Sequence, residues 1–417
     1  MRVLFLARLF GGLKPSLAAG EWKPAGMPAI YHLLEGLAED PDVELLTVFC
    51  LKERDPRFDQ KWHKTLSGIG ETILLPYRSL SGARRVDSAL TELESGARIM
   101  SAAAQHRPDI VYSTYATLLP AALLARAGHK VVLRFLGVVP HHREIASGRL
   151  PLFRWLLRSP FAHVVSSEDG SDPASVLPKL LRHSTPWSVR LNGCDAHLRA
   201  KQGAFGASAA GNGRDHRPTV LFLGRLEPYK GCLEFIDAAL TVLGSMPDAV
   251  DFIILGDGPL RPEMEARVKA AGREARVQFL GLRPHAEVAE RLAVADIYVS
   301  TNMYGNLSNA NLEAIAAGSC LLLPTSDASL PLDTVTDRLI PSDVAYRYDR
   351  SALPASLAQA LCELLKSPAQ IADRRARTAA LARTLIKPWA QSVAEDIALL
   401  KSIVMREDAT VAMPRTI

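Results

Sequence analysis

Short apolar runs of strand length alternate with segments of helical periodicity along almost the whole chain. The runs lie at residues 3–7, 44–49, 72–76, 110–113, 131–135 and 163–166, and then at 220–223, 252–255, 277–279, 297–299 and 321–324. Helical patterns such as those at 28–38 and 86–105 separate them. Because parallel strands need crossover helices, this order predicts parallel sheets, and its two sets of runs predict two Rossmann-like, doubly wound α/β domains.

The composition fits a two-domain enzyme. The 417 residues are 48% apolar, the mean hydropathy is +0.06, and no uninterrupted apolar stretch is long enough to span a bilayer. The net charge of +5 suits phosphate-bearing substrates or anionic lipid and argues against nucleic-acid binding. The five cysteines have no paired spacing, which predicts a reducing, cytoplasmic compartment and no zinc site. The apolar start, which Arg8 interrupts, indicates a first strand rather than a signal peptide.

A segment rich in Gly, Ala and Ser, residues 203–218, separates the two sets of runs. It can bury little apolar surface, so it predicts a flexible linker. Near the end, Pro388 interrupts a long helical pattern, because proline removes a backbone donor. We therefore expect a first domain over 1–195, a linker over 196–218, a second domain over 219–385, and a C-terminal helix and tail over 386–417.

Residues 221–231 (LFLGRLEPYKG) join an apolar run to a helical pattern. The run ends in Gly224, and two cations, Arg225 and Lys230, precede Gly231 and the expected helix. Such a turn can hold a diphosphate, because cations neutralise its oxygens, glycine lets the backbone approach, and the helix dipole favours an anion. Taken alone, the segment fits a solvated basic turn equally well.

Further motifs stand on both sides of this turn. They are SVRLNGCD at 188–195, FIILGDGPL at 252–260, VQFLG at 277–281, ADIYVST at 295–301 and SNANLEAIAAG at 308–318. In this order they resemble the nucleotide-binding half of the GT-B glycosyltransferases, in particular the retaining enzymes of family 4. The resemblance is dense over 189–324 and thin over the N-terminal half. It implies two Rossmann-like domains that face a cleft, with a C-terminal helix that crosses back to the first domain.

The resemblance also implies a nucleotide-diphosphate sugar as donor, with no metal ion and no other cofactor. Arg225 and Lys230 are then the catalytic cations, since charge develops on the departing diphosphate and preorganised cations stabilise it. Glu313 is then the acceptor of both ribose hydroxyls, and the alternative is a carboxylate that only complements the helix dipole. Gly224, beside the cations, and Leu282, directly after VQFLG, are further candidates for donor contacts.

One position departs from the family pattern. Gly305 stands eight residues before Glu313, where family members usually have a carboxylate near the hydroxyls of the donor sugar. Asn306, Ser308 and Asn309 follow, and such side chains can hydrogen-bond a sugar without bringing charge. Ser308 or Asn309 is also expected to cap the helix that carries Glu313. The site is therefore either a variant donor site or one that has lost activity.

The N-terminal domain is expected to supply the acceptor side. Many family members have a glycine-rich loop after the first strand that faces the donor phosphate and the acceptor, and Gly11, Gly12 and Gly26 match it here. Ordinary loop glycines explain these residues equally well. Arg134 interrupts a buried run, and a buried cation needs an anionic partner. The candidate partners are a substrate phosphate, Glu168 and Asp169.

Residues 149–160 (RLPLFRWLLRSP) alternate arginines with large apolar residues. The pattern fits a helix resting on an anionic membrane, as expected for an enzyme with lipid-linked acceptors. It also fits an amphipathic helix packed on the first sheet, which we favour. The expected location is the cytoplasm, with peripheral contact at the inner face of the plasma membrane as the further alternative.

The leading hypothesis is a retaining glycosyltransferase that acts on a glycan, a lipid-linked or a small-molecule acceptor. A nucleotide-sugar epimerase on the same fold is one alternative, and it needs acid and base groups but no acceptor. A phosphorylase ranks low, because it needs a lysine for pyridoxal phosphate and a much longer chain. A non-catalytic nucleotide-sugar-binding protein is the last alternative, and Gly305 motivates it. Sugar transfer, donor isomerisation and binding without turnover distinguish them.

Overall fold

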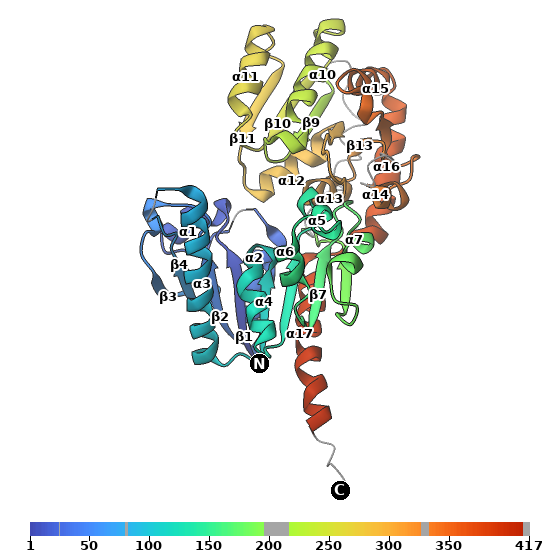
Figure 1. Ribbon diagram of the computed structural model, residues 1–417. Helices are drawn as coiled ribbons and strands as arrows, with labels where there is room; N and C mark the ends of the chain where they lie inside the picture. The colour runs from blue at the N-terminus through green and yellow to red at the C-terminus, as the bar shows by residue number, and fades with distance from the viewer. Residues whose placement is uncertain (25, 80–81, 196–216, 327–332, 412–417) are drawn as a thin grey trace. The chain divides into compact units, whose positions relative to one another are not determined.

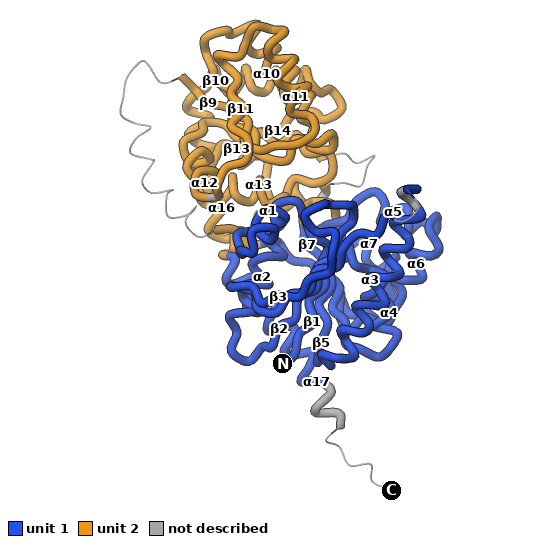
Figure 2. Tube along the Cα trace, turned by 90° about the vertical axis from the view of Figure 1, so that its left-hand side faces the viewer, with its two compact units in different colours: residues 1–168, 173–192, 389–417 blue, residues 169–172, 193–388 orange. Residues whose placement is uncertain are grey.

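The computed structural model describes residues 1–24, 26–79, 82–195, 217–326 and 333–411. The chain divides into two compact units (Figure 2). Unit 1 comprises residues 1–168, 173–192 and 389–417, and unit 2 comprises residues 169–172 and 193–388. The sequence placed the boundaries at 195 and 385 and did not anticipate that 169–172 joins the second unit. Most of the expected linker, residues 196–216, lies outside the described residues.

Unit 1 is built on an eight-stranded sheet with the order β3-β4-β2-β1-β5-β6-β7-β8 (Figure 1). Its strands are β1 (Arg2–Arg8), β2 (Glu44–Cys50), β3 (Trp62–Leu66), β4 (Gly70–Leu75), β5 (Ile110–Thr114), β6 (Val131–Phe135), β7 (His163–Ser167) and β8 (Trp187–Arg190). All neighbours are parallel except β3 and β4. The six strands predicted in this half are confirmed. The two that the sequence missed, β3 and β8, have mostly exposed or half-buried residues and therefore no continuous apolar run.

Helices cover both faces of this sheet. Apolar side chains of α3 (Arg84–His106), α4 (Leu118–Arg126), α5 (Pro140–Ala146), α6 (Pro151–Leu157) and α7 (Pro173–Leu180) form one core layer. The other layer contains α2 (Pro28–Glu39) and the C-terminal α17 (Trp389–Val411), while α1 (Lys14–Ala18) follows β1. Gly36 of α2 lets α17 approach, since a β-carbon there would collide with Val393. The predicted crossing of the C-terminal helix onto the first domain is confirmed.

Unit 2 has a six-stranded, wholly parallel sheet with the order β11-β10-β9-β12-β13-β14. Its strands are β9 (Thr219–Leu223), β10 (Asp251–Leu255), β11 (Val277–Gly281), β12 (Ile297–Val299), β13 (Cys320–Pro324) and β14 (Tyr346–Tyr348). This is the doubly wound order. Strands are added from β9 outward to β11 on one side and then from β12 outward to β14 on the other, so the order of strands reverses between β9 and β12. Ligands of open α/β sheets bind outside the carboxyl ends of the strands at this reversal.

The helices of unit 2 follow its strands in alternation. They are α10 (Cys232–Ser245), α11 (Arg261–Ala270), α12 (His285–Val294), α13 (Asn309–Ala317), α14 (Thr334–Leu339), α15 (Ala355–Leu365) and α16 (Pro368–Leu385). One core layer joins the sheet to α10, α11, α15 and α16. As predicted, the last helical pattern is interrupted near Pro388, with α16 ending at Leu385 and α17 beginning at Trp389. The predicted α/β class with two Rossmann-like sheets is confirmed.

Candidate functional site

The loops after β9 and β10 meet backbone to backbone at the carboxyl edge of the unit 2 sheet. Leu226 N donates to Asp257 O at 3.0 Å, and Gly224 N donates to Leu255 O at the same distance. A β-carbon on Gly258 would lie 2.5 Å from Leu226 O, and one on Gly256 would collide with Gly224 O. The glycines of the LGDGPL motif are thus required by close packing, and they hold the Gly224 loop in place at the sheet edge.

Lys230 ends a 3-10 turn, η4 (Pro228–Lys230), that leads directly into α10. Gly231 closes the turn with φ of +64°, and a β-carbon there would lie 2.5 Å from Thr301 O. The hydroxyl of Thr301 also donates to Lys230 O at 2.6 Å. The backbone of Lys230 is therefore fixed between the ends of β9 and β12, at the reversal of the sheet.

The side chain of Lys230 is half-buried, with Nζ 5.3 Å from the ring centroid of Tyr229. Burial lowers the pKa of its ammonium group, and the nearby carboxylate of Asp169 opposes that shift. Arg225 differs, because its side chain is 74% exposed and forms an ion pair with Glu227. The two predicted cations thus lie on one loop, and Lys230 is the one in a desolvated setting.

Asp169 belongs to the four-residue segment 169–172 of unit 2, and sequence reasoning did not connect it with Lys230. Burial raises the pKa of its carboxyl to about 6, while Ser171 N donates to Asp169 Oδ1 at 3.1 Å. The segment is held by backbone bonds, from Leu307 N to Asp169 O at 3.0 Å and from Asp333 N to Gly170 O at 2.7 Å. No periodic pattern marks these residues, so only the fold brings them to the site.

Gly305 has a packing reason to be glycine. A β-carbon at this position would lie 2.8 Å from the Gly170 carbonyl carbon, 2.9 Å from Ser171 N, and in collision with Asp169 O. The backbone of segment 169–172 therefore occupies the space that a side chain at 305 needs. A carboxylate, which family members usually have at this position, would not fit here unless that backbone moved.

We expect Gly305→Ala to lower the free energy of unfolding by about 1–3 kcal/mol, the usual effect of overpacking against backbone. Gly244→Ala is the matched control, because Gly244 lies in α10 with nothing within 4 Å of its ideal β-carbon. In a helix that replacement stabilises by about 0.5–1 kcal/mol. Urea unfolding of both variants checks this. Equal stability of Gly305→Ala and wild type would contradict the close packing.

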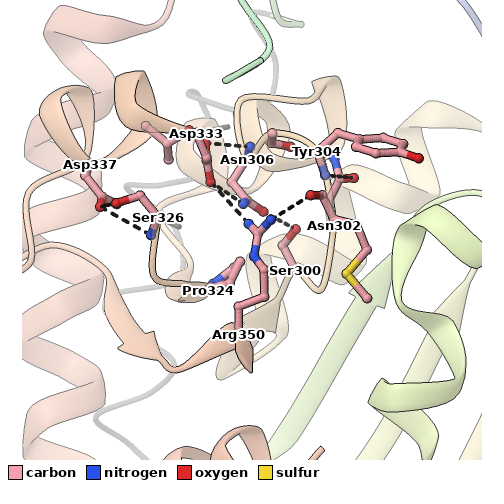
Figure 3. Close-up of polar contacts among 12 residues, drawn as sticks. Ser300, Asn302, Tyr304, Asn306, Pro324, Ser326, Asp333, Asp337 and Arg350 are labelled. Carbon is pink, nitrogen blue, oxygen red and sulfur yellow. Dashed lines mark hydrogen bonds and ion pairs between the residues drawn. The ribbon is translucent and has the colours of Figure 1, made fainter. Parts of the chain in front are cut away.

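Asn306 is fully buried in a polar network at the sheet edge (Figure 3). Its Nδ2 donates to Asp333 Oδ2 at 2.5 Å, and its Oδ1 accepts from Ser300 Oγ at 2.9 Å. Asn311 Nδ2 donates to Asn306 O at 2.9 Å, and Arg350 lies 3.6 Å from Asp333 Oδ2. The amide of Asn306 is thus engaged inside the protein and holds the loop before α13, which differs from the predicted contact with a sugar.

The other predicted donor residues lie nearer the surface. Ser308 is the N-cap residue of α13, but its hydroxyl donates to Asn311 Oδ1 at 3.3 Å instead of accepting from the helix backbone. Asn309 is the first residue of α13 and is half-buried. Leu282 follows β11 with 78% of its surface exposed. Ser308 therefore occupies the N-cap position without making the capping hydrogen bond that the sequence predicted. Leu282 is exposed, and internal packing does not explain a leucine at this position.

Glu313 lies in the second turn of α13 and is half-buried. Burial raises the pKa of its carboxyl to about 8, with a smaller contribution from the negative charge of Asp195. Its position past the first turn weakens the alternative that Glu313 only complements the helix dipole, because that effect fades within one turn. A carboxyl group with this pKa is largely neutral at pH 7.

Arg134 of unit 1 is not available to a substrate phosphate. Its side chain is 5% exposed, and Nη1 donates to Asp396 Oδ2 of α17 at 3.3 Å. Nη2 donates to Ser167 Oγ at 3.0 Å and Asn192 Oδ1 at 3.2 Å. The three predicted partners, a substrate phosphate, Glu168 and Asp169, are therefore wrong. The partner comes from the C-terminal helix, about 260 residues away along the chain, which the local pattern could not reveal.

The three glycines predicted for the acceptor side, Gly11, Gly12 and Gly26, lie in the segment between β1 and α2. Gly11 and Gly12 are exposed and lie in a 3-10 turn, η1 (Gly11–Leu13). Gly26 has φ of +72° and precedes α2. No neighbour lies within 4 Å of an ideal β-carbon at Gly11 or Gly26, so internal packing does not require glycine at these positions.

The predicted amphipathic segment forms α6 and places its apolar residues on two sides. Leu156 and Leu157 are buried, whereas Leu152 is 63% and Trp155 is 49% exposed. Arg126 stacks on Trp155 at 3.8 Å from the ring centroid. The favoured prediction, an amphipathic helix packed on the first sheet, is thus correct for only one face of α6. In the described ranges no helix meets the length and apolarity needed to cross a membrane, and no three His, Cys, Asp or Glu side chains gather as metal ligands.

Comparison with known proteins shows that part of unit 2 matches a known family. Residues 217–367 match the family described as Glycosyl transferases group 1. Over 103 residues the chain is 33% identical to the alpha-D-kanosaminyltransferase of Streptomyces kanamyceticus, covering 25% of this chain and 26% of that protein. It is also 33% identical over 169 residues to a phosphatidyl-myo-inositol mannosyltransferase of Mycolicibacterium smegmatis, covering 38% and 42%. The first of these matches thus spans about a quarter of the relative's length.

Solved structures resemble the whole chain. Sucrose-phosphate synthase from Thermosynechococcus elongatus matches 97% of this chain and 99% of its own, with a TM-score of 0.72 and 16% identity. Anabaena HepE, solved in complex with UDP, matches 96% of this chain and 100% of its own, with a TM-score of 0.65 and 18% identity. The fold is therefore GT-B, and residues 217–367 match the glycosyl transferases group 1 family.

Proposed function

We propose that this chain is a retaining glycosyltransferase that moves a sugar from a nucleotide-diphosphate sugar to a glycan, a lipid-linked or a small-molecule acceptor, without a metal ion. The observation that carries the proposal is Lys230, a half-buried ammonium group at the turn into α10. Burial opposes its positive charge, and an anion bound beside Nζ offsets that cost. Arg225 on the same loop and the first N–H groups of α10 supply further donors.

The chemistry follows from where charge develops. Breaking the bond between the anomeric carbon and the diphosphate leaves negative charge on the phosphate oxygens. Cations fixed at that position stabilise the transition state without reorganisation. Lys230 is fixed through its backbone and Arg225 is exposed for contact, so together they supply the positive charge that a metal ion would otherwise bring. Unit 1 would bind the acceptor, through the loop that contains Gly11, Gly12 and Gly26.

The relatives support a sugar nucleotide as donor. Two proteins similar to part of this chain are named as a kanosaminyltransferase and a mannosyltransferase. Anabaena HepE, similar in fold, was solved with UDP-glucose as well as with UDP. We therefore take uridine nucleotides as the first donor class to test.

The test is a screen of the purified full chain against nucleotide sugars by mass spectrometry and by proton NMR, which reports the configuration of the products, with EDTA present and with Mg²⁺ or Mn²⁺ added back. Transfer to water or an acceptor with retained configuration, unaffected by EDTA, is the expected result. Donor isomerisation would favour the epimerase, and binding without turnover would favour a nucleotide-sugar-binding protein. Activity that EDTA abolishes and a metal ion restores would contradict the proposed role of the cations.

Glu313 provides a prediction on pH. Ribose hydroxyls would donate to its carboxylate, so the nucleotide binds the ionised form. Burial raises the pKa of Glu313 to about 8, so below that pH binding must first remove a proton. Affinity for a nucleoside diphosphate should therefore rise as the pH increases toward 8, approaching about tenfold per pH unit, and level off above it. Titration calorimetry from pH 6 to 9 measures this.

Glu313→Gln is the matched control, because it keeps the shape and removes the titration. Its pH profile should lack the rise that Glu313 causes and keep only the contributions of the phosphate and of the other titrating groups at the site, Asp169 and Lys230. Asp195→Asn should move the rise of the wild-type profile to lower pH, because the negative charge of Asp195 contributes to the raised pKa of Glu313. Identical profiles for wild type and Glu313→Gln would remove Glu313 from the ribose site while leaving the proposal for Lys230 intact.

We also propose that unit 1 contacts an anionic membrane surface through α6. Leu152, Phe153 and Trp155 are exposed on this helix, and the exposed side chains of Arg149 and Arg158 flank them. Exposed aromatic and aliphatic groups beside arginines suit the interface of an anionic bilayer. Sedimentation with vesicles containing phosphatidylglycerol should be lost in a Leu152→Ala, Trp155→Ala variant. Equal sedimentation of this variant, or of wild type with neutral vesicles, would contradict the membrane contact.

A further inference from the structure

We propose that unit 1 carries a second ligand site, a groove between α3 and the edge strands of its sheet, that binds a small anionic amphiphile. The groove has a volume of about 440 Å³, within the range of small-molecule sites. The last turns of α3 form one wall, and β2, β3 and β4 form the other. The inference rests on this groove alone and does not depend on the proposed transfer reaction.

The groove exists because α3 presents small side chains where the sheet presents large ones. Ser101 and Ala102 of α3 line it on the helix side. Leu46 and Val48 of β2 line the sheet side, together with Ile73 of β4, all on one face of the sheet. A helix with larger residues at 101 and 102 would close this space. The apolar residues beneath it are themselves buried, with 4%, 1% and 8% of the surface of Leu46, Val48 and Ile73 exposed.

A buried histidine without a hydrogen-bond partner points to a polar group on that ligand. The side chain of His106 lines the groove and is 8% exposed. Its Nε2 is buried and has no hydrogen-bond partner among the residues that the structure describes, while Nδ1 lies 4.0 Å from Glu44. An unsatisfied buried nitrogen is unfavourable, and a ligand oxygen bound at Nε2 would remove that cost.

The rim of the groove favours a negative charge. Among the lining residues Arg98 and Lys61 carry positive charges and Glu71 a negative one, and the carboxylate of Glu44 lies 4.0 Å from His106 Nδ1. Glu71 is already paired with His63 at 2.6 Å, and Arg98 with Glu94 at 2.6 Å. Lys61 is exposed and has no ion pair with any residue that the structure describes. An anionic head group therefore fits the rim beside Lys61 and His106, with the apolar body on the floor.

The groove lies at the amino edge of the unit 1 sheet. Arg2, the first residue of β1, donates from Nη1 to His106 O at 3.5 Å, which places His106 at the amino edge of the sheet. Loops that follow parallel strands, such as the one with Gly11 and Gly12, lie at the opposite, carboxyl edge. A ligand in the groove would therefore lie at the opposite edge of the unit 1 sheet from the loop with Gly11 and Gly12.

Calorimetry and methyl NMR with three probes test this proposal on the full chain. Octanoate carries both a charge and an apolar body, octan-1-ol lacks the charge, and acetate lacks the body. We expect octanoate to bind at least about tenfold more tightly than either of the others, since one lost charged contact is worth about 1.4 kcal/mol or more. The methyl signals of Ile73 and Leu46 should shift on binding.

Two variants locate the binding. Ala102→Leu fills the groove and should weaken octanoate binding at least about tenfold, whereas Ala104→Leu, on the exposed side of the same helix, should leave it unchanged. His106→Leu provides a second variant that removes the buried nitrogen without adding volume over the floor, and it should also weaken binding. Thermal melts confirm that each variant is folded. Absence of octanoate binding, shifts confined to unit 2, or equal binding by Ala102→Leu and wild type would overturn the proposal.

Discussion

Replacing Lys230 with alanine is expected to lower the rate of sugar transfer by about 10²–10³-fold, or roughly 3–4 kcal/mol of transition-state stabilisation. The reason is the setting of its ammonium group. Lys230 is fixed by Gly231 and Thr301 at the reversal of the unit 2 sheet, and burial opposes its charge until an anion binds. A cation held in this way need not reorganise when charge develops on the diphosphate.

The measurement is single-turnover kinetics with the donor found in the screen, together with a thermal melt. Lys269→Ala is the matched control, because Lys269 lies exposed on α11 of the same unit. Lys230→Arg should recover part of the rate, since it keeps the charge but changes its geometry. Arg225→Ala should have the smaller effect, because its side chain is 74% exposed and already paired with Glu227. A near wild-type rate in a folded Lys230→Ala would refute the diphosphate assignment.

Arg134→Met is expected to lower the free energy of unfolding of unit 1 by about 3 kcal/mol, the effect of breaking a buried ion pair from one side. The variant leaves Asp396, whose side chain is 11% exposed, with Arg190 as its remaining ion-pair partner at 3.0 Å. It also leaves Ser167 and Asn192 without the donor that they share. The effect is structural, so the rate per folded molecule should be affected much less.

The loss should depend on pH. Burial already raises the pKa of Asp396, and removing Arg134 raises it further. The penalty applies to the ionised carboxylate, so it is full above that pKa and shrinks as the pH falls and Asp396 takes up a proton. Urea unfolding at pH 5 and pH 8, with hydrogen exchange of β6 to report on unit 1, measures it.

Two controls accompany this prediction. Asp396→Asn in the Arg134→Met background should restore part of the stability, because the buried group is then neutral. Arg2→Met, at a pair whose side chains are 43% and 36% exposed, should cost no more than about 1 kcal/mol. If Arg134→Met lowered the free energy of unfolding as little as Arg2→Met does, the ion pair between Arg134 and Asp396 would not be important for holding α17 on unit 1.

Most of the strands and the main helices could be predicted because their information is local. A parallel strand covered on both faces needs a continuous apolar run, and β1 and β9 are such runs. The edge strand β3 has a half-exposed sequence that any loop could have, so its partner β4 alone determines that it is a strand. The GRLEPYKG turn was recognisable for a similar reason, since cations, glycine and helix start are adjacent in sequence.

The sequence by itself determined the two Rossmann-like sheets, the turn with Arg225 and Lys230, and the break before Trp389. Only the tertiary structure decided which residues complete or withdraw from the site. The carboxylate of Asp169 lies near Lys230, and the backbone of 169–172 occupies the space beside Gly305. The side chain of Asn306 is hydrogen-bonded to Asp333 inside the protein, and Arg134 forms an ion pair with Asp396. Each of these contacts joins residues far apart along the chain, and burial and charge pairing act on distance in space, which a linear pattern does not record.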